Sequence, residues 1–276
     1  MIFSIASMNI NTVFPKAFFK NHIFFSSVKK DYCLPRGKMY HFELVFKKQL
    51  LPYYIVPYNP LAIPHIINKS AISTIIYQNE SICKINWQKK QAIVTLSERV
   101  RSPEMLFFDY LKLLFSSLLI QKGGLPLHSS AVSKNGNGIA FYGPSGVGKS
   151  TIAGLLSPDW KMLNDDVTFI VPYKGGYRMY STPFIAPGKY EQISKGAAKL
   201  LALFLIHKQN SNSFFEMTIQ EKIFSLTSSM FALPLSDSFS QKMLRNIEMF
   251  CKKVIVQKLS FKNDISILQK INGFKG

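Results

Sequence analysis

A glycine-rich segment near the middle of the chain has the residue types and spacing of a phosphate-binding loop. It fits the pattern Gly-x-x-x-x-Gly-Lys-Ser/Thr and consists of Gly143, Pro144, Ser145, Gly146, Val147, Gly148, Lys149 and Ser150, followed by Thr151. Glycine allows backbone conformations in which successive N–H groups point into one concavity, and the positive end of a following helix favours phosphate there. Lys149 would add a charge for the β- and γ-phosphates of ATP, and the Ser150 hydroxyl would bind Mg²⁺. The alternative is a glycine-rich turn without a ligand.

Two adjacent acids, Asp165 and Asp166, supply the second half of such a site. The sequence predicts short strands at 161–164 and 167–171, with the acids at the end of the first. A phosphate-binding loop needs a carboxylate at the end of a neighbouring strand to hold the metal. Adjacent strand residues point to opposite sides, so one acid could face Mg²⁺ while the other takes the proton of an acceptor hydroxyl. The alternative is a solvated Asp-Asp turn.

His128 is the third candidate, because it opens the predicted strand 128–132 that pairs with the strand leading into the loop. From there an imidazole could point toward bound phosphates. A lone histidine in a strand is as often a structural residue, and both interpretations stay open.

The elements around these residues alternate between strand and helix. The loop follows an apolar strand at 139–142 and opens a helix through Leu156. Ser102 and Pro103 begin a helix that runs to Gln121, and Thr218 begins another through a capping box with Glu221. A helix over 237–252 and a strand over 254–261 follow. This alternation predicts an α/β fold with a sheet that is at least partly parallel.

Residues 1–102 are predicted to form a smaller, β-rich N-terminal module. Apolar alternation predicts a strand at 39–46, and two strands at 82–87 and 92–96 flank a polar turn, which is typical of a hairpin. No chemical constellation is found here. The predicted organisation is therefore a β-rich module over 1–102 and a phosphate-loop domain over 103–276, which includes the connecting helix.

Composition narrows the function classes. Of 276 residues, 47% are hydrophobic and 18% charged, which excludes a disordered tail or a coiled coil. Three scattered cysteines, without a CxxC pair, argue against a disulfide scaffold. The net charge of +19 comes almost entirely from lysine. Since arginine is the usual reader of bases and phosphates, we expect a solvated lysine surface and no specific nucleic-acid partner.

A membrane partner is not expected either. The most apolar window, 105–120, is shorter than the ~20 residues of a membrane span and carries Asp109 and Lys112. The N-terminus lacks the basic leader of a signal peptide. The sequence therefore predicts a cytoplasmic enzyme, and a homo-oligomer is compatible with it.

The stretch from Leu125 to Val171 resembles the catalytic domain of the HPr kinase/phosphorylase family. The resemblance rests on Leu127-His128, the hairpin, the glycine-rich loop and Leu163-Asn-Asp-Asp166. Those enzymes phosphorylate a protein serine and share their fold with ATP-dependent phosphoenolpyruvate carboxykinases. The order of later elements is similar to HPr-kinase-related proteins of modified-peptide gene clusters, including lasso-peptide kinases.

The resemblance implies a role for each candidate residue. ATP phosphates would bind at residues 143–151. Mg²⁺ would bind at Ser150 together with the acid pair, in particular Asp166. Asp165 would be the base, and His128 would lie near the transferring phosphoryl group. Family members carry Glu after the loop serine, where this chain has Thr151. Their glycine- and arginine-containing signature downstream of the acids is absent, so neither HPr as acceptor nor the reverse reaction is implied.

Three functions fit these observations. The first is a Mg-ATP-dependent kinase that phosphorylates a serine of a peptide or small protein. The second is a small-metabolite kinase of the same fold. The third is an ATPase or nucleotide-binding subunit of a biosynthetic complex. An LSGGQ-type segment and an Asn-Lys-x-Asp motif are both missing, which argues against a transporter ATPase and a GTPase.

Overall fold

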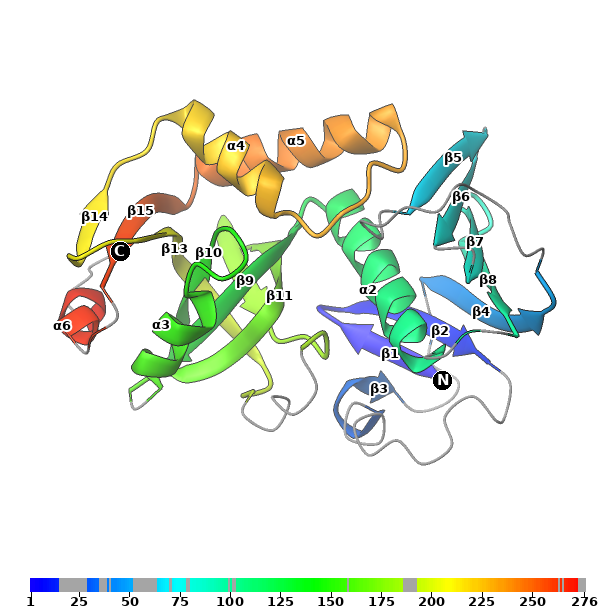
Figure 1. The fold of residues 1–276 in the computed structure, drawn as a ribbon, viewed down its shortest axis with the longest axis horizontal. Helices are drawn as coiled ribbons and strands as arrows, with labels where there is room; N and C mark the ends of the chain where they lie inside the picture. The colour runs from blue at the N-terminus through cyan, green and yellow to red at the C-terminus, as the bar shows by residue number, and fades with distance from the viewer. Residues whose placement is uncertain are drawn as a thin grey trace. The chain divides into compact units, whose positions relative to one another are not determined.

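The computed structural model describes residues 1–14, 29–34, 39, 41–51, 64–69, 71–77, 80–98, 100, 103–157, 159–185, 193–262, 264 and 266–272. The chain forms two compact units: unit 1 comprises residues 1–115 and 234–237, and unit 2 comprises residues 116–233 and 238–276. The division falls within helix α2 (Pro103–Gln121), and the boundary expected at 102–103 precedes this helix. Each unit contains a β-sheet, so the protein has a mixed α/β fold with two sheets (Figure 1).

Unit 1 is built on an eight-stranded sheet in the order β3-β1-β2-β4-β8-β7-β6-β5. Among the strands described in this unit, only the β2–β4 and β4–β8 pairs are parallel. The strands are β1 (Ile2–Ile5), β2 (Met8–Val13), β3 (Cys33–Leu34), β4 (Phe42–Gln49), β5 (His65–Lys69), β6 (Ile72–Tyr77), β7 (Ser81–Asn86) and β8 (Gln91–Ser97). The predicted hairpin is confirmed as β7 and β8, which pair antiparallel.

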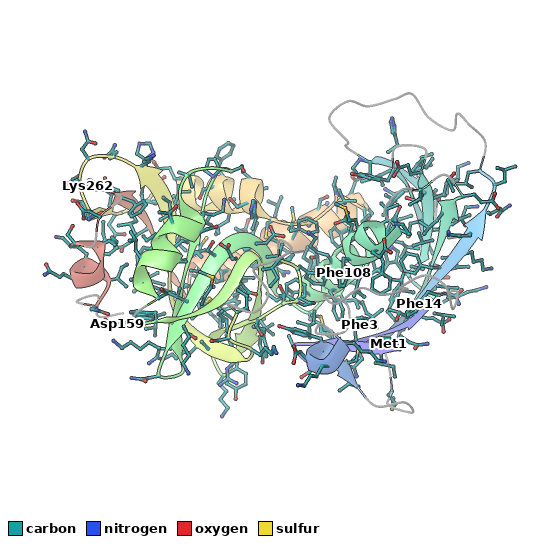
Figure 2. The ribbon with its side chains drawn as sticks, turned by 60° about the horizontal axis from the view of Figure 1, so that its bottom comes forward. Met1, Phe3, Phe14, Phe108, Asp159 and Lys262 are labelled. Carbon is teal, nitrogen blue, oxygen red and sulfur yellow. The ribbon has the colours of Figure 1, made fainter. Side chains whose placement is uncertain are left out.

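The core of unit 1 is aromatic. Phe107 on α2 is fully buried, and its ring contacts the rings of Phe3, Phe14, Phe46 and Phe108 at centroid distances of 5.2–5.8 Å. Figure 2 labels three of these partners, Phe3, Phe14 and Phe108. Tilted and edge-on ring pairs add specific geometry to the burial of apolar area. Phe107 is therefore a central contact between this helix and the residues around it.

Unit 2 contains a seven-stranded sheet in the order β10-β9-β11-β12-β13-β15-β14. An additional parallel pairing of β10 with β13 closes the first five of these strands into a ring. The β13–β15 pair is also parallel. The strands are β9 (Leu125–Lys134), β10 (Asn137–Tyr142), β11 (Lys161–Tyr173), β12 (Gly176–Tyr180), β13 (Ala197–Lys208), β14 (Ser213–Phe215) and β15 (Ile255–Phe261). The expectation of a partly parallel sheet is confirmed.

Helices lie against both faces of this sheet (Figure 1). Helices α3 (Lys149–Leu156) and α6 (Ser266–Asn272) contribute to one apolar cluster, which includes Phe141 and Phe204. Helices α4 (Ile219–Ser229) and α5 (Asp237–Cys251) contribute to the other, which includes Leu226 and Phe250. Alternate strand residues feed the two clusters, as the period of two requires.

Most predicted elements of this part are confirmed within one or two residues. Helix α2 begins at Pro103, although Ser102, its expected N-cap, lies outside the described residues. Thr218 caps α4, and the Thr218–Glu221 capping box is formed in both directions. Helix α5 and strand β15 match the predictions at 237–252 and 254–261.

The prediction that Asp165 and Asp166 end a short strand is wrong. Residues 161–173 form one continuous strand, β11, and both acids lie inside it. The strand continues because β9 pairs with it over almost its whole length, from Lys161–Ser133 to Ile170–Leu125. Inter-strand hydrogen bonding thus overrides the low β-propensity of two aspartates.

Within the described residues, no helix is long and apolar enough to span a membrane.

Candidate functional site

Residues 143–150, here called the 143–150 loop, connect the end of β10 to the start of α3. Gly143, Gly146 and Gly148 have φ angles of 138°, 77° and 106°, which are unfavourable for residues with a Cβ atom. A Cβ on Gly148 would lie 3.2 Å from the ring of Phe261, a buried residue of β15. The backbone geometry therefore favours glycine at all three positions, and close packing against Phe261 adds to this preference at Gly148.

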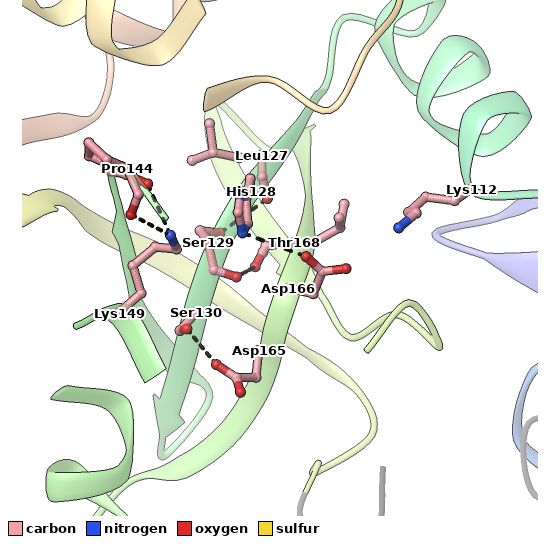
Figure 3. A network of polar contacts seen from close by, with 12 residues as sticks. Lys112, Leu127, His128, Ser129, Ser130, Pro144, Lys149, Asp165, Asp166 and Thr168 are labelled. Atoms are coloured by element: carbon pink, nitrogen blue, oxygen red, sulfur yellow. Dashed lines mark hydrogen bonds and ion pairs between the residues drawn. The ribbon is translucent and has the colours of Figure 1, made fainter. Parts of the chain in front are cut away.

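Lys149 is the first residue of α3 and one of the few buried charged side chains among the described residues. Its ammonium group donates hydrogen bonds of 3.0 Å to the carbonyl oxygens of Gly143 and Pro144, so it lies back over the loop (Figure 3). Burial lowers the pKa of Lys149, and the charges of Asp166 and Asp165 oppose that shift. The loop and the two carboxylates therefore act on the same cation.

The adjacent carboxylates have different partners on β9. The Ser130 hydroxyl donates a hydrogen bond of 2.7 Å to Oδ1 of Asp165, and the two residues are paired in the sheet register. Asp165 is only 8% exposed, whereas the side chain of Asp166 is 33% exposed. Figure 3 shows the two carboxylates pointing in different directions from β11. The two carboxylates therefore lie in different environments, one buried against Ser130 and one partly exposed.

A buried asparagine fixes the strand beside the acids. The Asn164 side chain donates to the carbonyl oxygen of Tyr180 at 2.7 Å and accepts from the backbone N–H of Thr182 at 2.8 Å. The Thr182 hydroxyl donates in turn to the carbonyl oxygen of Val167 at 2.7 Å. These bonds flank Asp165 and Asp166 on both sides, which restrains the backbone that carries them. Sequence reasoning missed this role, because it depends on residues that are distant in the sequence.

His128 lies in β9, which pairs antiparallel with β10 as the sequence predicted. Its Nε2 atom is 3.6 Å from Oδ1 of Asp166, and its side chain is 43% exposed. It also lines the cavity next to the 143–150 loop. The structure therefore brings His128 next to both Asp166 and the 143–150 loop.

The residues present suit Mg²⁺ bound together with a nucleotide. Ser150 is exposed in the first turn of α3, and Asp165 and Asp166 are close enough to act electrostatically on the preceding lysine. The described residues hold no group of three or more His, Cys, Asp or Glu side chains arranged for a metal. Magnesium in phosphoryl-transfer sites commonly takes one or two carboxylates and completes its shell with phosphates and water. The donor set therefore fits a metal that arrives with ATP.

A cavity of about 630 Å³ borders the loop. It lies within the ~300–1,000 Å³ range of small-molecule sites. Gly143, Pro144, Ser145, Val147 and His128 line it on one side. The other walls come from β13, α4 and β15 and consist of Leu205, Ile206, His207, Met217, Glu221, Phe224, Ser225, Ser228, Ser229 and Lys258.

Helix α4 is a fixed wall of this cavity. Ser225 and Tyr142, the residue just before the loop, are joined by a hydrogen bond of 2.9 Å between their hydroxyl groups. Leu226 is fully buried. Beyond the helix, the N–H of Phe231 donates to the carbonyl oxygen of Pro126 at 2.8 Å. The capping box predicted the helix, but nothing in the sequence pattern placed it beside the loop.

The comparisons with known proteins are of different strength. Curated protein sequences give no match to this chain. A solved structure, the Hpr(Ser) kinase/phosphatase from Coxiella burnetii, is similar over 53% of this chain and 90% of its own, with a TM-score of 0.30 and 9% sequence identity. This is a weak structural likeness.

A family match covers most of the chain. Residues 82–275 match the family described as SynChlorMet cassette protein ScmC, from strand β7 to beyond helix α6. The match includes the 143–150 loop, both acids, His128 and all walls of the cavity. This chain therefore belongs to the SynChlorMet cassette protein ScmC family.

Proposed function

We propose that this chain is a Mg²⁺-dependent phosphotransferase that moves the γ-phosphoryl group of ATP to a serine hydroxyl of a peptide or small protein. The observation that carries the proposal is the position of Lys149, which contacts two carbonyl groups of the 143–150 loop and is influenced by both Asp165 and Asp166. One buried cation thus connects a loop suited to phosphate with two carboxylates suited to metal and proton chemistry.

The loop would bind the triphosphate. Its three glycines have positive φ angles, and it leads into the N-terminus of α3, where backbone N–H groups and the helix dipole favour anions. When ATP binds, Lys149 can exchange its two carbonyl partners for phosphate oxygens, which are stronger acceptors because they carry charge. Ser150 and Thr151 are exposed in the first turn of the same helix. All these residues belong to the predicted set 143–151.

Ser150 and Asp166 are the proposed metal ligands, directly or through water. Mg²⁺ held there would neutralise charge on the phosphate oxygens. Asp166 is the more exposed of the two acids, so its carboxylate can reach a hydrated metal without a large loss of solvation. His128, 3.6 Å away, orients that carboxylate and would lie near the phosphoryl group in transfer.

Asp165 is the proposed general base. The Ser130 hydroxyl holds its Oδ1 atom, and burial keeps water away from it. As the acceptor oxygen bonds to the γ-phosphorus, the bond from that phosphorus to the β,γ-bridging oxygen breaks and ADP leaves. The acceptor proton passes to the Asp165 carboxylate. General base catalysis of this kind contributes typically ~10²–10⁴-fold to a rate.

The choice of acceptor rests on the resemblance of residues 125–171 to HPr kinase catalytic domains. Those enzymes act on a protein serine, which favours a peptide or small protein over a metabolite. The glycine- and arginine-containing signature of that family is missing downstream of the acids, so HPr itself is not the proposed acceptor.

The test is an incubation with γ-³²P-labelled ATP, Mg²⁺ and a set of serine-containing peptides, followed by mass spectrometry of the labelled products. We expect phosphoserine on peptide, and no label when EDTA removes the metal. Label on small metabolites alone would show that the acceptor is a metabolite and not a peptide. Free phosphate as the sole product, with every peptide unlabelled, would show an ATPase and contradict the proposal.

A further inference from the structure

The cavity beside the 143–150 loop has apolar walls to which the proposed function assigns no role. Its lining includes five apolar side chains: Val147, Leu205, Ile206, Met217 and Phe224. Phe224 is 75% exposed, which is unusual for a phenylalanine in an amphipathic helix with a buried face. Other lining side chains are polar or charged, among them His207, Glu221 and Lys258, so the cavity combines apolar walls with polar groups, as ligand sites do.

The cavity lies next to the proposed phosphate site. Gly143 and Pro144 line it, and the ammonium group of Lys149 lies 3.0 Å from the carbonyl oxygen of each. In the proposed function this lysine binds the terminal phosphates of ATP. His128, which pairs with Asp166, lines the cavity as well. The cavity therefore adjoins the part of the loop where the terminal phosphate of ATP would bind.

The walls of the cavity are preorganised. The Tyr142–Ser225 hydrogen bond ties the middle of α4 to the strand that leads into the loop. The bridge between Leu127 and Met230 ties the end of α4 to β9, next to His128. A rigid pocket lowers the cost of ordering on binding, so its shape can select among ligands.

On the basis of the proposed function, we infer that this cavity binds an apolar side chain adjacent to the acceptor serine, with Phe224 as a specificity-determining residue. The occupant is a peptide segment with a large apolar residue next to serine. Such a side chain loses its hydration in the cavity and covers the exposed ring of Phe224. The serine beside it is thereby held near the 143–150 loop, where the terminal phosphate would bind.

The test uses the full chain, MgATP and alanine-based peptides that contain one serine flanked by leucine or by glycine. We expect kcat/KM to be about tenfold higher for the leucine peptides. Phe224→Ala should reduce this preference to about twofold and leave the Kd for MgATP unchanged. Ile219→Ala is the matched control, since Ile219 is an exposed apolar residue of the same helix that does not line the cavity.

The outcomes separate this inference from the function on which it rests. Labelled peptides without a preference for leucine, or a preference that survives Phe224→Ala, would overturn the inference alone. A weaker Kd for MgATP in Phe224→Ala, with an unchanged Kd for Mg-tripolyphosphate, would show that the cavity holds the nucleoside and would also overturn it. Absence of label on every peptide, with ATP still hydrolysed, would overturn the proposed function and this inference together.

Discussion

Units 1 and 2 are both built on a sheet, yet they bury different kinds of groups. Among the described residues, the side chains buried in unit 1 are apolar or uncharged, and its central contact is the ring cluster around Phe107. Unit 2 buries two charged side chains, Lys149 and Asp165. Burying a charge costs free energy unless it is paired. The two buried charges of unit 2 are therefore explained by a role in chemistry and not by a contribution to stability.

The contrast between the two units predicts its largest effect at Asp165. Asp165→Asn keeps the shape of the side chain and removes the proposed base, so we expect phosphoryl transfer to fall about 10³-fold. The Kd for MgATP, measured by calorimetry, should change less than about threefold, because Asp165 is not a proposed phosphate ligand. Asp159→Asn is the control: Asp159 is an exposed residue of unit 2 with an ion pair to Lys134 (Figure 2). If Asp165→Asn transfers phosphate as fast as the parent protein, Asp165 is not the general base.

Phe107→Leu tests whether the ring cluster of unit 1 contributes to stability and not to MgATP binding. The substitution removes several ring contacts in unit 1 and should lower the free energy of unfolding by about 1–3 kcal/mol. Chemical denaturation followed by circular dichroism measures this loss. In the folded variant the Kd for MgATP should be that of the parent protein. A large loss of MgATP affinity in the folded variant would mean that the two units do not divide stability and chemistry in this way.

Ser130→Ala sharpens the comparison within unit 2. The Ser130 hydroxyl donates to Asp165, so its removal leaves one carboxylate oxygen without this donor, and we expect kcat to fall about tenfold with KM unchanged. Ser130→Thr keeps the hydroxyl and should restore most of the rate. A purely structural role would instead lower thermal stability and leave the kcat of the folded enzyme intact.

The smallest expected effect concerns acid stability at Asp264. Hydrogen bonds from Ser266 and Lys262 lower the pKa of Asp264 from 3.8 to about 2. Because the folded state favours the ionised carboxylate, this stabilisation is complete above about pH 4 and is lost as the pH falls toward 2. Unfolding midpoints between pH 4 and 2 should therefore decline slightly less steeply in Asp264→Asn than in the parent protein. An identical slope would show that the carboxylate makes no contribution.

The parts of the fold that could be predicted depend on neighbours in the sequence. The 143–150 loop, the Thr218 capping box and the β7–β8 hairpin are set by spacings of a few residues, and all three have the predicted backbone structure. Their local geometry leaves few alternatives.

The parts that could not be predicted depend on distant partners. Asp165 and Asp166 lie inside a strand because β9 pairs with it, and Ser130, the partner of Asp165, is 35 residues away. The Tyr142–Ser225 contact that forms the α4 wall joins residues 83 positions apart. The β10–β13 pairing that closes the ring has no local signal at all. Contacts of this kind follow from the packing of the whole unit.

The most direct test of the central claim is a calorimetric titration of MgATP into the parent protein and Lys149→Met. Methionine keeps the length and packing of the side chain and removes its charge, while Lys161→Met, at an exposed position of β11, serves as the control. The account predicts one MgATP site in the parent and in Lys161→Met, and at least about 100-fold weaker binding in Lys149→Met, with folding preserved. Folded parent protein that binds no MgATP, or that binds it as tightly when Lys149 is replaced, would contradict the account.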